Sequence, residues 1–210
     1  DYTLCLVVTV VVVVAYTIGG GLLAVVNTDV FQFVVICLAI VLIIPCSLSA
    51  AGGMDELIQK VPAGYFDIFS QGFLAPMSLG LLYMFDYATN QHILQRVFAA
   101  KDSSTARFAF GFSSAVYVIF GLAVAFIGVI AYALYPHLDN PSNAYALIVK
   151  DILPPGTSGI ALGGLFAAAM STADSKIMAA SQLFINDIYE PYICKGKVTD
   201  DKKVLSTSRI

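Results

Sequence analysis

Long apolar runs separated by short polar stretches form the dominant pattern of this chain. A run of about 20 apolar residues crosses the hydrocarbon core of a bilayer as a helix. On this criterion we predict five spans, at residues 2–18, 30–51, 72–99, 108–135 and 160–188. The glycines Gly19, Gly20 and Gly21 are expected to separate the first two spans. The loops at 51–70 and 136–159 are each expected to contain a short helix, near Met54–Lys60 and Ser142–Ile152.

The third predicted span, residues 72–99, differs from a plain membrane anchor. Pro76 and Gly80 weaken its first half, and the polar segment FDYATNQ then interrupts the apolar run. A helix broken at membrane depth, with polar groups at the break, is typical of transporter binding sites. We therefore predict a discontinuous helix, broken near residues 86–89. The alternative is that the span ends near Tyr87 and leaves NQHILQR at the membrane surface.

Polar side chains also occupy the middle of the fifth span, at Ser171, Thr172, Asp174, Ser175 and Lys176. A charged group at membrane depth costs roughly 2.5–3.5 kcal/mol on insertion scales, so such groups face other helices or water. The spacing i, i+3, i+4, i+7 places four small or polar residues on one helical face: Ala168, Ser171, Thr172 and Ser175. Oxygen ligands at close quarters suit a hard cation. The alternative is a polar seam between packed helices.

Asp29 precedes the second predicted span. One interpretation is that Thr28 or Asp29 caps this helix and binds the free N–H groups at its start. The other is that Asp29 faces an ion route at the edge of the membrane.

Composition supports an all-α integral membrane protein. Of 210 residues, 59% are hydrophobic and 12% are charged, against about 25% charged in soluble domains. The net charge of −3 gives no reason to expect a nucleic-acid partner. The four cysteines lack metal-site spacing, and His92 and His137 lack nearby partners, so neither an enzyme nor a cofactor is expected. The chain lacks an initiator Met, which predicts a fragment of a longer protein.

Basic residues set the expected orientation, because cytoplasmic loops are enriched in Lys and Arg. With five spans, one side of the membrane has only Lys60 and Lys150. The other side has eight basic residues: Arg96, Lys101, Arg107, Lys195, Lys197, Lys202, Lys203 and Arg209. We therefore place residue 1 outside the cell and the tail, residues 190–210, in the cytoplasm.

Three segments together resemble the sodium:solute symporter family, which includes sodium–glucose, proline, pantothenate and choline carriers. They are YTIGGGLLAVVNTDVFQ at Tyr16–Gln32, NQHILQRVFAAKDSSTAR at Asn90–Arg107 and GLFAAAMSTADSKIMAASQLFINDIY at Gly164–Tyr189. The resemblance implies a LeuT-type fold of two inverted five-helix repeats, of which this chain would form core helices four to eight.

The resemblance also implies site residues. Ala168, Ser171 and Thr172 match the family's sodium site, which the first core helix completes. Candidates for a second sodium site are Asp29, Ser171, Asp174 and Ser175. The alternative for Asp174 is a pair with Lys176 or Arg96 at the cytoplasmic mouth. Solute would contact the broken third span, at Tyr83, Asp86, Tyr87 and Asn90. Asp86 replaces an aromatic gate residue of the sugar carriers, and Tyr117 stands where a sugar-binding relative has Lys. These departures argue against a sugar. The alternatives for the Asp86 carboxylate are contact with an amine or other cation, uptake of a proton, or a structural role within the site.

From these observations we predict part of a secondary active transporter in the cell membrane, in which inward Na⁺ movement drives uptake of a small organic solute. Its partners would be Na⁺, the solute, the lipid bilayer and the remaining helices of the full-length transporter. Two alternatives stay open: a proton-coupled transporter of the same fold, and a structural or channel-like membrane protein in which the polar seam only packs.

Overall fold

The structure is a computed structural model that describes residues 2–98 and 100–193. The basic tail residues predicted to be cytoplasmic, from Lys195 onward, lie outside the described residues. Every regular element of the described ranges is helical. The long helices are α1 (Tyr2–Ala50), α3 (Leu74–Thr89), α5 (Ser103–Leu134) and α7 (Thr157–Phe184). The short ones are α2 (Gly53–Lys60), α4 (Gln91–Phe98) and α6 (Ala144–Asp151), with 3₁₀ turns at Ala63–Phe66 and Pro141–Asn143.

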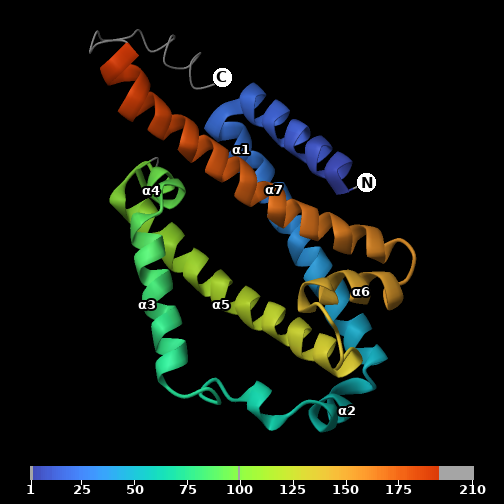
Figure 1. Ribbon diagram of the computed structural model, residues 1–210. Helices are drawn as coiled ribbons and strands as arrows, with labels where there is room; N and C mark the ends of the chain where they lie inside the picture. Colours follow the sequence, from blue (N-terminus) through green and yellow to red (C-terminus); the bar gives the residue numbers. More distant parts are fainter. Residues whose placement is uncertain (1, 99, 194–210) are drawn as a thin grey trace. The chain divides into compact units, whose positions relative to one another are not determined.

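Helix α1 covers both the first and most of the second of the predicted spans. It is assigned as helix throughout, including Gly19, Gly20 and Gly21, although its ribbon turns sharply in its first half (Figure 1). Glycine lowers helix propensity by about 1 kcal/mol per residue without forbidding the conformation. Since Asp29 lies inside this helix, neither it nor Thr28 begins one. The Thr28 hydroxyl instead donates a hydrogen bond to the Val25 carbonyl at 2.9 Å.

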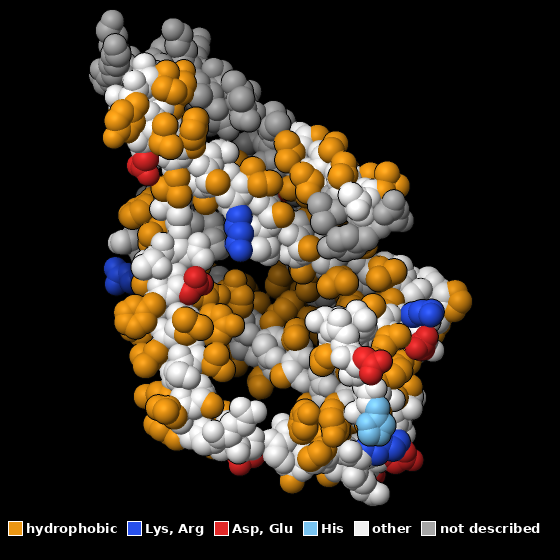
Figure 2. Space-filling model, in the orientation of Figure 1, with side chains coloured by type: hydrophobic (Ala, Val, Ile, Leu, Met, Phe, Trp, Pro, Cys, Tyr) orange, Lys and Arg blue, Asp and Glu red, His pale blue; other side chains and the backbone are white. Residues whose placement is uncertain are grey.

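Apolar side chains are widely exposed, as expected where lipid or other helices cover the surface. Figure 2 shows them over much of the visible face, with few and scattered charges. Leu74, Phe98 and Phe108 are each at least 74% exposed. By length and composition, two of the described helical stretches can cross a membrane, Val25–Ala50 and Ser103–Leu134. The other three predicted spans stay predictions, since α3 is short and α7 is polar in its middle.

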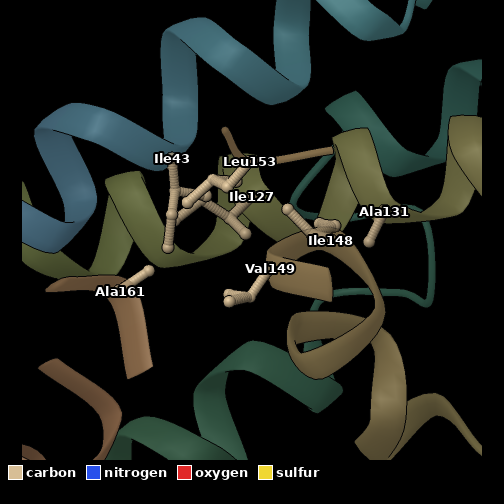
Figure 3. Close-up of a cluster of buried hydrophobic side chains, with 7 residues drawn as sticks. All are labelled: Ile43, Ile127, Ala131, Ile148, Val149, Leu153 and Ala161. Carbon is tan, nitrogen blue, oxygen red and sulfur yellow. The ribbon is translucent and has the colours of Figure 1, made fainter. Parts of the chain in front are cut away.

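Contacts divide the chain into two compact units, residues 1–34 with 166–210 and residues 35–165. The core of the second unit lies where α6 packs against α1, α5 and the start of α7. It is a cluster of buried aliphatic side chains (Figure 3): Ile43, Ile127, Ala131, Ile148, Val149, Leu153 and Ala161. The Tyr145 hydroxyl adds a hydrogen bond of 2.8 Å to the Ala161 carbonyl. Burial raises the pKa of Tyr145, so the hydroxyl stays a donor at neutral pH.

Local signals explain several helix ends. Helix α1 is followed by Ala51 and then by Gly52, which has a φ of 95°. This left-handed conformation commonly follows the last turn of a helix. Asp102 caps α5 by accepting a hydrogen bond of 2.7 Å from the Thr105 N–H. That bond favours the ionised carboxylate and lowers the pKa of Asp102.

The α-helical part of α7 ends at Phe184, and residues Ile185–Ile193 continue in π-helical geometry. The predicted fifth span, residues 160–188, therefore covers most of α7 and the first π-helical residues.

Candidate functional site

The first part of the site, within the unit of residues 1–34 and 166–210, joins α7 to α1. The Ser171 hydroxyl donates a hydrogen bond of 2.7 Å to Oδ1 of Asp29, across 142 residues of sequence. Both side chains are half-buried. A hydroxyl bonded to a carboxylate makes a short, charge-assisted hydrogen bond. The structure thus places side by side two residues that the family resemblance groups as candidates for a second sodium site.

Asp174 and Ser175 lie one turn further along α7 and are both buried. Asp174 is 0% exposed, and its Oδ1 accepts a hydrogen bond of 2.8 Å from the Ser175 N–H. A buried carboxylate requires hydrogen bonds or a cation to offset its lost hydration. Asp174 is therefore a carboxyl group held away from water by the packing of this unit.

The predicted ligand face of α7 is divided in the structure. Ser171 and Ser175 are at least partly covered, whereas Ala168 and Thr172 are exposed. The Thr172 hydroxyl donates to the Ala168 carbonyl at 3.1 Å. In the helical ladder the Ala168 carbonyl also accepts the backbone N–H four residues on, so this bond uses its second lone pair, whereas the Thr172 hydroxyl oxygen stays able to accept or to ligate. The described residues thus leave one edge of this face open.

Sequence reasoning missed one polar residue of this unit. Gln32 lies on α1 three residues after Asp29, and its side chain is 9% exposed. Its Oε1 atom makes no hydrogen bond with any described residue. The available signal was an amide inside the apolar run DVFQFVV, at a spacing that places it on the helical face of Asp29.

The predicted solute residues lie in the second unit, on α3 and at its end. Tyr83, Asp86, Tyr87 and Asn90 recur at i, i+3, i+4 and i+7, so they form one face. The helix ends at Thr89, and α4 begins at Gln91, so the interruption is at Asn90, one residue beyond the predicted stretch (Figure 1). Asn90 has an extended ψ of 113°, and its carbonyl accepts hydrogen bonds from the Ile93 and Leu94 N–H groups.

An aromatic pair connects this face to α5. The rings of Tyr87 and Tyr117 lie 6.2 Å apart at 89°, an edge-to-face arrangement. Such a pair is worth about 0.5–1.5 kcal/mol beyond the area it buries. The side chain of Asp86 is exposed beside this pair, and none of the described residues forms an ion pair with it.

These features are those of an all-helical chain with long apolar helices and polar side chains gathered on two helical faces. Comparison with known proteins agrees, since the sequence model of the sodium:solute symporter family matches residues 1–210. The chain belongs to the sodium:solute symporter family. Members of this family are membrane transporters and not enzymes.

Several characterised relatives are similar to this chain at 27% identity. A sodium/pantothenate symporter of Haemophilus influenzae aligns over 198 residues, covering 90% of this chain and 40% of the relative. An osmoregulated proline transporter of Bacillus subtilis aligns over 213 residues, 98% of this chain and 43% of the relative. A sodium/glucose cotransporter of Vibrio parahaemolyticus aligns over 228 residues, 92% of this chain and 41% of the relative. The chain thus spans about two fifths of the length of these relatives.

Proposed function

We propose that this chain forms part of a secondary active transporter that couples inward Na⁺ movement to uptake of a small organic solute. The observation that supports it most directly is the Ser171–Asp29 hydrogen bond, at one edge of the hydroxyl-bearing face of α7. The names of the relatives agree, since two of them couple sodium to pantothenate or to glucose.

The proposed architecture is LeuT-type, with five spans that form core helices four to eight. In this plan residue 1 lies outside the cell and residue 210 lies in the cytoplasm. The interruption at Asn90 supports the assignment of α3 and α4 to the discontinuous helix that opens the second repeat.

In the proposed first sodium site, oxygens of Ala168, Ser171 and Thr172 bind Na⁺. Na⁺ is a hard cation, and hydroxyl and carbonyl oxygens are suitable ligands for it. Ala168 and Thr172 are exposed in this chain, so the face is open to ligands from another helix of the full-length transporter.

In the proposed second site, Asp29, Ser171, Asp174 and Ser175 bind a further Na⁺. The Ser171 oxygen donates its proton to Asp29 and keeps lone pairs for a cation. A cation beside Asp29 and Asp174 would also neutralise carboxylates that are costly at membrane depth.

We assign the solute to the face formed by Tyr83, Asp86, Tyr87 and Asn90. Tyrosine rings and a carboxylate on one helical face favour a solute that combines apolar surface with a donor or positive group. Coupling then follows from differential binding: Na⁺ stabilises the outward-open state, and its release to the cytoplasm allows the solute to leave inward.

The test is uptake by the full-length transporter in proteoliposomes, with an inward Na⁺ gradient, a proton gradient or neither. Candidate solutes are screened by competition. The proposal predicts accumulation driven by Na⁺ and its loss in the Asp86→Asn variant. Accumulation driven only by the proton gradient would support the proton-coupled alternative. Equilibration without accumulation would support a channel or a packing seam.

A further inference from the structure

Exposed apolar side chains are concentrated in the segment that connects α1 to α3. Helix α2 and the 3₁₀ turn at Ala63–Phe66 occupy most of this segment. Its exposed large apolar side chains are Met54, Ile58, Phe66, Ile68, Phe69 and Phe73. Apolar side chains that are gathered in this way, and not scattered singly, mark a surface that contacts a membrane or another protein.

Helix α2 has one apolar face and one polar face. Met54, Leu57 and Ile58 share a face, because they are three and four residues apart. The fold buries Leu57 completely and leaves Met54 and Ile58 exposed, so it covers only part of this face. The opposite face is polar and exposed throughout, with Asp55, Glu56, Gln59 and Lys60. A helix divided in this way lies along the boundary between an apolar medium and water.

Helix α2 lies where two helices that can cross a membrane end together. These stretches are Val25–Ala50 and Ser103–Leu134. Leu57 packs in one buried cluster with Ala51, directly after the first end, and with Ile130, one turn before the second. Two such ends side by side mark the depth of the membrane surface. At that depth lipid is the apolar medium beside the helices, and water faces the polar side of α2.

Specific contacts hold α2 and the turn against these helix ends. The Lys60 ammonium group donates hydrogen bonds of 2.8 Å to the Ala51 carbonyl and to Oε2 of Glu56. The ring of Tyr65 lies 4.7 Å from the ring of Tyr132 of α5. Tyrosine is enriched at membrane–water interfaces, where the ring contacts lipid and the hydroxyl meets the headgroups. The segment is therefore fixed at the depth of the helix ends.

We propose that α2 and residues 61–73 form an anchor along the membrane surface, with Met54, Ile58 and Phe69 inserted among lipids just below the headgroups. The segment carries three carboxylates and one ammonium group, at Asp55, Glu56, Asp67 and Lys60. Attraction by anionic lipid therefore does not hold it, and burial of apolar side chains does. A zwitterionic phospholipid is sufficient as the partner. This inference goes beyond the proposed function and is independent of the coupling ion.

The test measures the depth of single spin-labelled cysteines in a full-length transporter that lacks its native cysteines and is reconstituted in phosphatidylcholine. Ile58→Cys and Phe69→Cys report on the apolar side. Gln59→Cys is the matched control, since it is exposed on the polar face of the same helix. Oxygen concentrates in lipid, whereas a nickel complex stays in water. We expect the ratio of relaxation by oxygen to relaxation by nickel to be several-fold higher at the two apolar positions than at the control.

Three results would overturn the inference. Strong relaxation by nickel at all three positions would place the segment in water. Immobilised labels at positions 58 and 69 that neither reagent reaches would mean that other helices of the full-length transporter cover this surface. Labels that enter lipid only after phosphatidylglycerol is added would show that charge holds the segment. If Ile58→Cys does not reach the membrane, Met54→Cys replaces it, because Met54 is exposed on the same face.

Discussion

At the scale of single residues, the account depends on a hydroxyl and a carboxylate at membrane depth. Ser171 and Asp29 are half-buried and 2.7 Å apart. The same bond serves a packing seam as well as an ion site, and the two roles differ in their energetics. A mutation in a packing seam changes only the stability of the protein. A mutation in an ion site also changes the ion concentration at which the site is half-occupied.

A double-mutant cycle on this pair separates the two roles. We expect Ser171→Ala to raise the Na⁺ concentration for half-maximal uptake by about 10- to 100-fold, because a hydrogen bond to a charged group is worth about 1.5–3 kcal/mol. Asp29→Asn should raise it at least as much, and the double variant should be less affected than the product of the single effects, because the residues are in contact. Fully multiplicative effects would show that the two side chains act independently.

The sequence was sufficient to select Ser171 and Asp29, since both are polar residues in or beside apolar runs. It was insufficient to decide whether Asp29 caps a helix, because a cap depends on where the helix begins. The structure decides this by continuing α1 through the position. Gln32 was missed for a related reason: whether an amide is buried and unpaired depends on the packing of its helix, which no local pattern records.

At the scale of elements, the second unit contains a close approach of α7 to α1. A Cβ added to Gly164 would lie 2.6 Å from the Cβ of Ala39 and 3.6 Å from the backbone of Val35 and Ile36. Ala39 itself is 2% exposed. Small residues at such crossings let membrane helices pack backbone to backbone.

Gly164→Ala should therefore lower the melting temperature of the purified transporter, with a cost of about 1–3 kcal/mol for overpacking. Gly159→Ala is the matched control in the same helix, because among the described residues its added Cβ meets nothing within 4 Å apart from its own stretch of helix. Adding Ala39→Gly to the Gly164→Ala variant should restore most of the loss by exchanging the two volumes. A melting temperature unchanged by Gly164→Ala would show that the helices are further apart than described.

The docking of α6 is expected to depend on burial more than on its hydrogen bond. Ile148 is 0% exposed in the apolar cluster, so Ile148→Ala should cost about 2–5 kcal/mol. Tyr145→Phe removes only the bond to the Ala161 carbonyl and should cost about 0.5–1.5 kcal/mol. Exposed Lys150→Ala, the control, should be within about 0.5 kcal/mol of wild type. Thermal unfolding in detergent measures all three, and the reverse order of the first two would contradict this view of the core.

Several elements could be predicted from the sequence because their signals are local. The polar segment FDYATNQ contains the residue between α3 and α4, since polar side chains and loss of apolar periodicity coincide there; that this interruption lies at membrane depth stays a prediction. The helical conformation of Gly19–Gly21 could not be predicted, because glycine only weakens a helix and the rest of the sequence decides the outcome.

At the scale of the whole molecule, the proposed topology rests on the distribution of basic residues. It can be tested in a full-length transporter from which the native cysteines, including Cys5, Cys37, Cys46 and Cys194, have been removed. Single cysteines are then introduced one at a time. A membrane-impermeant thiol reagent added to intact cells should label His137→Cys and leave Lys101→Cys unlabelled until the membrane is permeabilised. Both positions are exposed, so access to the reagent depends on the side of the membrane. The opposite pattern would invert the orientation.

The most direct test of the central claim is the melting temperature of the full-length transporter, titrated with NaCl at constant ionic strength in choline chloride. A bound ion stabilises the folded state by RT ln(1 + [Na⁺]/Kd), so the melting temperature of the wild type should rise with Na⁺. For the double variant Ser171→Ala, Thr172→Ala, we predict that the titration curve shifts to much higher Na⁺. A wild type that melts at the same temperature in both salts, or a double variant with the wild-type curve, would contradict the assignment of a sodium site to this face of α7.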